Sequence, residues 1–449
     1  MESFKLLHTA LIYDRIPVSE YISERTGITV IIADEEGPAA IASFHLITEP
    51  DNVGLPGALR RLVFMGSEQF PYKDVPCLMI NDGFGNFSKQ VYFDHTAYTV
   101  ETIFAEELFT LLPIIGDYIL FPLLNEESFL TEVHHITGEG EDAGGMYEDV
   151  SSEESEIDIY HSVRKESITL TKIKEYHEKF YRPENLKIIV IGSIKPEEVF
   201  ESLQKLEDKI VSKGQRDDFQ RPLQPIRPPP MESSKNLEIT VPSDKETHGT
   251  FYIAWRTLSC IEDSYTILGL SMVLNYLTEC STSPLLKELV ESDDPFARNV
   301  YSFKVKNKVS CLCIVFENVP VKKLSQIEAK FQEVLLRMVK DRDIDMKRME
   351  TIIETHKMKR IITLEQYPSY LIQCVLMRYL IYGNAEDRCL NPLPELERLL
   401  EEPQTFWLDL IQKYLVENHR ISVQIIPNKE VKRDMAKKEK ERLKLKNEI

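Results

Sequence analysis

The sequence lacks the features that point to nucleic-acid or membrane partners. None of its apolar runs approaches the roughly 18 residues that a membrane-spanning helix needs. The formal net charge is −19, whereas proteins that bind nucleic acid or anionic membranes usually do so through positive charge. The seven cysteines are scattered and form no paired C-x-x-C zinc knuckle, which favours a reducing compartment. We therefore expect a protein that binds neither nucleic acid nor membrane.

Signals for export and for several common catalytic sites are missing as well. Residues 1–25 have no long apolar core and carry four acidic side chains, unlike a secretory signal or an Arg-rich transit peptide. We therefore expect a cytoplasmic protein. There is no G-x-S-x-G nucleophile elbow. Gly83-Phe-Gly85 lacks the third glycine of a dinucleotide fingerprint, and residues 138–145 lack the Lys-Ser/Thr pair of a phosphate-binding loop.

The patterns that are present indicate an α/β protein. The 449 residues are 43% hydrophobic and 28% charged, which is ordinary for a globular chain with a sizeable core. Through the first ~215 residues, predicted strands and helices alternate. We expect a hairpin around residues 35–38 and a strand through residues 90–100. We also expect a helix from residue 106 that is interrupted near Pro113 and closes at Pro122.

A proline-rich stretch, residues 221–231, divides the chain. Proline removes backbone donors and favours extended backbone, so this stretch predicts a linker between residues 1–220 and residues 232–428. In the second part the order of strands and helices starts again, which indicates two similar domains. Residues 429–449 are highly charged without an apolar stripe, as is typical of a solvated tail.

Residues 54–67 predict a short loop followed by an apolar helix, and the candidate site is built around them. Their leucines recur at helical spacing, so one face of the helix should be buried. On such a helix, positions 57 and 61 lie one turn apart on one side, with position 60 beside them. Gly57, Arg60 and Arg61 occupy these positions.

Four segments around this helix carry recognisable motifs. Residues 54–73, 94–100, 122–144 and 176–186 contain the strings LVFMGSE, DHTAYTV, GEGEDAG and YHEKFYRPENL. Together they resemble the M16 (insulinase, pitrilysin-like) metallopeptidases, in particular the first half of the presequence-protease branch. The resemblance implies an α+β sandwich of two homologous M16-like domains, each a mixed sheet with flanking helices. It also implies a zinc-dependent endopeptidase activity in the family.

The zinc motif of that family is degenerate in this chain. The family has His-x-x-Glu-His, in which two imidazoles bind Zn²⁺ and the glutamate activates a water molecule. Gly57 offers no side chain, Arg60 stays protonated and is no base, and Arg61 puts a fixed positive charge where the cation would lie. We therefore expect no bound zinc, no other cofactor and no catalytic residue.

Two alignments are possible for the third zinc ligand of the family, which is a glutamate. In one register Asp149 replaces the family's glutamate, with Glu148 beside it; in another, Glu132 and Glu139 form the acidic pair. One hypothesis is that Arg60 or Arg61 pairs with Asp149 or Glu148, so that a salt bridge replaces the metal.

Two other pairs of residues are candidates for a site. His134 and His135 are adjacent, and because neighbouring side chains point in different directions they rarely chelate one ion together. Asp94 and His95 lie in a strand that, in the resembling family, is near the cleft and helps to position substrate. The alternative interpretation is a hydrogen-bonded pair at the edge of the core.

The expected function is therefore that of a pseudo-enzyme subunit that binds a peptide or an M16-related protein partner, with an oligomer possible. The runner-up is a residual metallopeptidase that uses acids between Glu132 and Asp149, with His134 or His135 as improvised ligands. A third interpretation is a degenerating duplicate without retained activity.

Overall fold

The chain divides into two compact units. The computed structural model describes the residues other than 1–2, 38, 50–53, 83–84, 93, 133–134, 137–141, 144–167, 215–216, 221, 223–230, 260–262, 306–308, 383–389, 436 and 438–449. Unit 1 comprises Met1–Pro225 and Tyr367–Leu390, and unit 2 comprises Ile226–Gln366 and Asn391–Ile449. The expected range 232–428 did not anticipate that part of it, Tyr367–Leu390, packs with unit 1.

Unit 1 is built on a seven-stranded mixed sheet with the order β1-β2-β3-β9-β4-β6-β5. Only β3 and β9 pair in parallel, and the other neighbours are antiparallel. The strands are β1 Phe4–Ile12, β2 Ile16–Ser23, β3 Thr29–Ala33, β4 Ala40–Ile47, β5 Asn86–Val91, β6 His95–Thr102 and β9 Leu186–Ile191. A short separate pairing joins β7 His135–Ile136 to β8 Asp142–Ala143.

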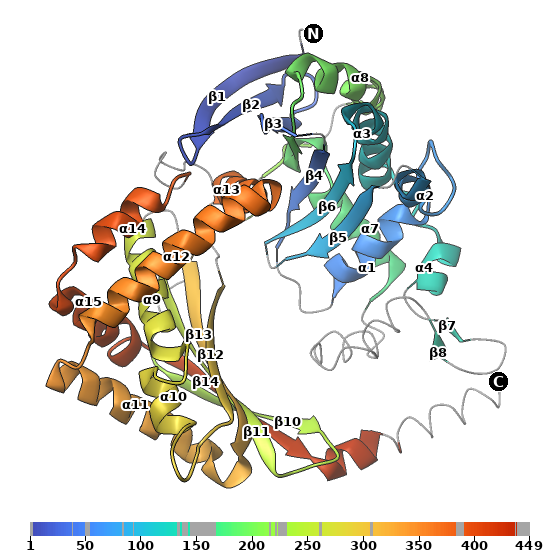
Figure 1. Cartoon of the computed structure of the whole chain (residues 1–449). Helices are drawn as coiled ribbons and strands as arrows, with labels where there is room; N and C mark the ends of the chain where they lie inside the picture. The colour runs from blue at the N-terminus through green and yellow to red at the C-terminus, as the bar shows by residue number, and fades with distance from the viewer. Residues whose placement is uncertain are drawn as a thin grey trace. The chain divides into compact units, whose positions relative to one another are not determined.

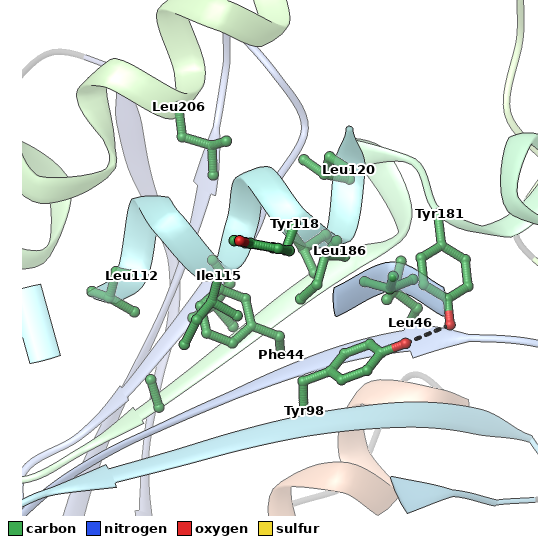
Figure 2. Close-up of a cluster of buried hydrophobic side chains, with 14 of the residues drawn as sticks. Phe44, Leu46, Tyr98, Leu112, Ile115, Tyr118, Leu120, Tyr181, Leu186 and Leu206 are labelled. Atoms are coloured by element: carbon green, nitrogen blue, oxygen red, sulfur yellow. Dashed lines mark hydrogen bonds between the residues drawn. The ribbon is translucent and has the colours of Figure 1, made fainter. Parts of the chain in front are cut away.

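Helices cover this sheet (Figure 1). They are α1 Leu55–Leu62, α2 Val75–Asp82, α3 Ala105–Leu120, α4 Glu126–Glu132, α7 Leu170–Phe180, α8 Pro196–Ser212 and α13 Pro368–Tyr382. The core lies between α3 and the alternate residues of β4 and β6 that face it, among them Phe44 and Tyr98, with Ile115 and Tyr118 on the helix (Figure 2). This alternation is the period of two that a strand imposes on its side chains.

The opposite face of the sheet is covered too. Ile31 and Ile189 point away from the main core yet are almost fully buried. The helix α13 packs against β9, and its Ile372 and Leu376 are buried. Strands that are buried on both faces read as continuous apolar runs, which is why β3 and β9 are mostly Val, Ile, Leu and Ala.

Three local expectations were wrong. The strands on either side of residues 35–38 do not form a hairpin, because β9 lies between β3 and β4 in the sheet and pairs with both. Residues 90–100 are not one strand: β5 ends at Val91, and a turn closed by the hydrogen bond from Tyr92 N to His95 O, 2.8 Å, leads into β6. The helix from residue 106 is not interrupted at Pro113, because α3 runs from Ala105 to Leu120 with the proline inside it. Buried side chains on both sides of Pro113, such as Leu112 and Ile115, favour the continuous helix over the lost backbone bond.

Unit 2 repeats the architecture with a five-stranded mixed sheet in the order β10-β14-β11-β13-β12. Its strands are β10 Lys235–Pro242, β11 His248–Ser259, β12 Asn299–Val305, β13 Val309–Pro320 and β14 Arg420–Asn428, with β10 and β14 parallel. Its α-helices are α9 Ser264–Thr278, α10 Pro284–Leu289, α11 Leu324–Asp341, α12 Met346–Gln366, α14 Leu393–Leu400 and α15 Gln404–Ile411. The α/β class and the arrangement as two mixed sheets with flanking helices are therefore confirmed (Figure 1).

Within the described part of the chain, no helix is both long and apolar enough to cross a bilayer. The cytoplasmic location stays a prediction.

Candidate functional site

The helix α1 positions the three residues of the degenerate motif. It begins after Gly54, whose φ of 89° lies in the left-handed region that glycine adopts without strain. Pro56 occupies a position at the start of the helix where a missing N–H costs no hydrogen bond. One face, including Leu59, is buried in the core, and Gly57 is half-buried. The predicted helix is thus confirmed.

Arg60 and Arg61 both line a pocket of about 240 Å³. We call it the basic pocket. Its described lining comes from α1, the turn before α2, β5 and the end of α4: Arg60, Arg61, Met65, Lys73, Asp74, Lys89 and Glu132. Four of these side chains are cationic and two are carboxylates, in a chain whose total formal charge is −19.

Glu132 is the central anion of the pocket. It is 8% exposed and accepts a hydrogen bond at Oε1 from Lys73 Nζ, 2.6 Å away. Its other oxygen, Oε2, lies 3.7 Å from Nη1 of Arg61. Because a buried carboxylate is costly unless it is paired, these two cations are what allow Glu132 to stay inside. The cluster joins α1 to α4 and to the turn before α2.

A second set of contacts holds Arg60 and Lys89. Arg60 donates from Nη1 to the backbone carbonyl oxygen of Lys89, 3.0 Å away, in strand β5. Lys89 Nζ donates to Oδ1 of Asp74 at 2.8 Å and lies 4.3 Å from the ring centroid of Phe64. Lys89, which lines the pocket, therefore combines an ion pair to Asp74 with a cation–π contact to Phe64.

The charge of Arg60 also affects the pKa values of two buried tyrosines. The hydroxyls of Tyr98 and Tyr181 are 2.9 Å apart and hydrogen-bonded, as the dashed line in Figure 2 shows. Burial raises the pKa of Tyr181 to about 12 and that of Tyr98 well above its usual 10. The Arg60 charge opposes both pKa shifts. Both tyrosines therefore stay neutral near pH 7.

The described residues of the basic pocket do not fit a zinc ion. Zinc needs lone pairs from imidazole, thiolate or carboxylate at about 2.0–2.3 Å, usually from three or four protein ligands. Gly57 has no side chain, the guanidinium groups of Arg60 and Arg61 have no lone pair to give, and Glu132 is held by cations. Among the described residues, no group of three or more His, Cys, Asp or Glu could hold a metal.

Asp94 and His95 form a hydrogen-bonded pair apart from the pocket lining given above. His95 Nδ1 lies 2.7 Å from Asp94 Oδ1, and both side chains are buried. The ring of Tyr92 stacks on His95 at 4.3 Å between centroids, and His45 lies 5.5 Å from His95 on the same measure. The pair is thus enclosed by aromatic rings, and its role in a cleft stays a prediction.

Several predicted residues lie outside the described part of the chain. These are His134, Glu139, Glu148 and Asp149. The hypothesis that Arg60 or Arg61 pairs with Asp149 or Glu148 therefore stays a prediction. Among the described residues, Arg61 pairs with Glu132.

Lys73, Asp74 and Lys89 also belong to the site, although no pattern in the sequence indicated them. They come from a turn and an edge strand, and no spacing along the sequence links them to α1.

Comparisons with known proteins agree with this fold. Residues 167–355 match the family model described as the peptidase M16 inactive domain. An uncharacterized protein of Schizosaccharomyces pombe is 30% identical over 467 residues, covering 95% of this chain and 44% of that protein. The mitochondrial presequence protease of Candida albicans is 24% identical over 289 residues, covering 56% of this chain and 28% of that protein.

A solved structure shares the fold over most of the chain. It is a protease from Helicobacter pylori, with a TM-score of 0.73 and 16% identity, covering 91% of this chain and 99% of that one. The chain spans less than half the length of the curated relatives above. In the match over residues 167–355 and in its fold, the chain is similar to the M16 peptidases. The assignment of Gly57, Arg60 and Arg61 to the positions of the family's zinc motif stays a prediction.

Proposed function

We propose that this chain is a non-hydrolytic M16 subunit that binds a peptide or a protein partner. One observation carries the proposal: at the positions of the zinc motif, Arg60 and Arg61 enter a pocket with two lysines and a buried, paired Glu132. A cation-lined pocket repels Zn²⁺, and no described side chain there can act as a general base beside a metal-bound water.

The position of β5 supports binding of an extended chain. It is the last strand in the order of the seven-stranded sheet, so its outer edge presents backbone groups to which another strand can pair. Lys89 of β5 lines the basic pocket, so a peptide along this edge would pass the pocket. Binding and hydrolysis are separable in this proposal, because the edge strand is present whereas Gly57, Arg60 and Arg61 offer no zinc donor.

The test is zinc content together with peptide cleavage. We expect substoichiometric zinc, by elemental analysis of protein purified without chelator, and no cleavage of a fluorogenic peptide library, with or without added zinc. We also expect a subset of the same peptides to bind.

Stoichiometric zinc and chelator-sensitive cleavage would overturn the proposal in favour of a residual metallopeptidase with ligands between Glu132 and Asp149. Absence of any peptide or partner binding would favour a duplicate without retained activity.

A further inference from the structure

The hydrogen-bonding pattern of the hairpin with β6 determines which backbone groups of β5 point outward. At the turn of this hairpin, Tyr92 N donates to His95 O, so these two residues form a hydrogen-bonded pair. Along an antiparallel ladder, hydrogen-bonded and non-hydrogen-bonded pairs alternate. The N–H and C=O groups of Phe87, Lys89 and Val91 therefore point away from β6, to the side where the described sheet has no further strand. An added strand would bond to these three residues.

The side chain of Arg60 occupies the middle of this outer edge. The helix α1 lies beside β5 (Figure 1), and Arg60 Nη1 donates to the carbonyl oxygen of Lys89, 3.0 Å away. An added strand would donate a backbone N–H to the same oxygen at about 2.9 Å. The spacing of about 4.8 Å between neighbouring strands leaves no room for a guanidinium beside the added backbone. The added strand and the Arg60 side chain therefore compete for one position.

We propose that Arg60 closes the outer edge of β5, so that an extended peptide segment pairs there only when the guanidinium leaves the Lys89 carbonyl. This inference rests on the proposed function and adds a regulatory contact to the binding edge proposed there. The closing bond has a charged donor, and such bonds are stronger than neutral ones. Charged side chains on an edge strand also hinder unwanted pairing between copies of a protein. The parent protein should therefore bind an extended peptide more weakly than a variant with an open edge.

The experiment measures binding of a labelled eight-residue peptide of alternating Val and Thr, with both ends blocked, by fluorescence anisotropy. In the full chain, Arg60→Met removes the donor and keeps an unbranched side chain. We expect this variant to bind the peptide about tenfold more tightly than the parent, because the peptide no longer has to displace a charged hydrogen bond. The matched control is Arg182→Met, since Arg182 is also a half-buried arginine of unit 1 that donates to a backbone carbonyl, that of Asp217, outside the strands of the sheet. The control should bind the peptide as the parent does.

Two further measurements show whether the gain in affinity arises at β5. Val91→Pro removes an outward N–H and puts a proline ring on the edge, so it hinders strand addition without removing a bond to β6. Combined with Arg60→Met, it should return the affinity to that of the parent or below. Hydrogen exchange followed by mass spectrometry needs no second variant: in Arg60→Met, the bound peptide should slow amide exchange in residues 86–91, whose outward N–H groups it pairs with.

The outcomes separate this inference from the proposed function. Equal affinities of the parent and Arg60→Met, or a gain that Val91→Pro leaves intact without slower exchange in residues 86–91, would overturn the closure while peptide binding stands. If neither protein binds the peptide, the closure is overturned, whereas capture of a folded M16-related partner would still support the proposed function. A gain in Arg60→Met that is absent in Arg182→Met and lost on adding Val91→Pro would support the closure.

Discussion

Replacing Glu132 by Gln tests whether the ion-pair cluster stabilises unit 1. Glu132 is the last residue of α4, is 8% exposed, and contacts two cations from different segments of the chain. Glutamine keeps the shape of the side chain and removes its charge. Arg61 and Lys73 then face each other without the anion that lies between them.

The size of the effect follows from the geometry. A hydrogen bond to a charged group contributes about 1.5–3 kcal/mol to stability. Lys73 Nζ lies 2.6 Å from Glu132, but its side chain is 53% exposed, so solvent screening reduces this contribution. Arg61 at 3.7 Å adds a weaker electrostatic contribution. We therefore expect Glu132→Gln to lower the free energy of unfolding of unit 1 by roughly 1–2 kcal/mol.

The assay is thermal unfolding followed by circular dichroism, with each transition fitted separately because the chain has two units. In a unit of this size, 1 kcal/mol corresponds to about 2–4 °C in Tm. The control is Glu201→Gln, an exposed glutamate within α8 for which we expect a change in stability below about 0.5 kcal/mol.

A double-mutant cycle with Lys73→Gln completes the test. If the two side chains interact as described, the loss in the double variant is smaller than the sum of the single losses, because both single variants break the same contact. Additive losses, or a Glu132→Gln protein as stable as Glu201→Gln, would refute the reasoning.

Two further predictions concern titrating groups elsewhere. His45 is buried and has no hydrogen-bond partner at either ring nitrogen among the described residues. Burial, with a smaller effect from His95, lowers its pKa well below 6.5. Below pH 6.5 the imidazole of His45 is therefore protonated in the unfolded chain but stays neutral in the folded chain. As the pH falls below 6.5, the free energy of unfolding decreases by about 1 kcal/mol per pH unit until the pKa of His45 in the folded chain is reached. His45→Phe should remove this slope between pH 7.5 and pH 5.5, and an unchanged slope would contradict the assignment. In unit 2, a hydrogen bond from the Thr282 hydroxyl, aided by Ser283 and Arg348, lowers the pKa of Cys280 to about 7, whereas burial raises that of Cys313 to about 11. Iodoacetamide at pH 7 should therefore modify Cys280 first in peptide mapping, and equal rates at the two cysteines would count against the lowered pKa.

Local patterns in the sequence predicted much of the fold. The helix at residues 54–67 and the α/β class follow from apolar spacing, because the period of a helix or strand is set by the backbone itself. The sequence-based predictions were wrong at residues 35–38, where β9 pairs between the two expected hairpin strands. They were also wrong at residues 90–100 and at Pro113, where a turn hydrogen bond and tertiary packing decided the outcome. It also gave no sign that Tyr367–Leu390 belongs with unit 1, since that depends on contacts with distant strands.

For the candidate site, the sequence by itself determined what three of its residues cannot do. Gly57, Arg60 and Arg61 cannot bind zinc or act as a base in any fold, because their side-chain chemistry forbids it. Only the tertiary structure decided which residues surround them: it brings Glu132 to Arg61 and Lys73, residues that lie 71 and 59 positions away along the chain. Pairings over such distances depend on how helices and turns pack together, and nothing in local sequence spacing encodes them.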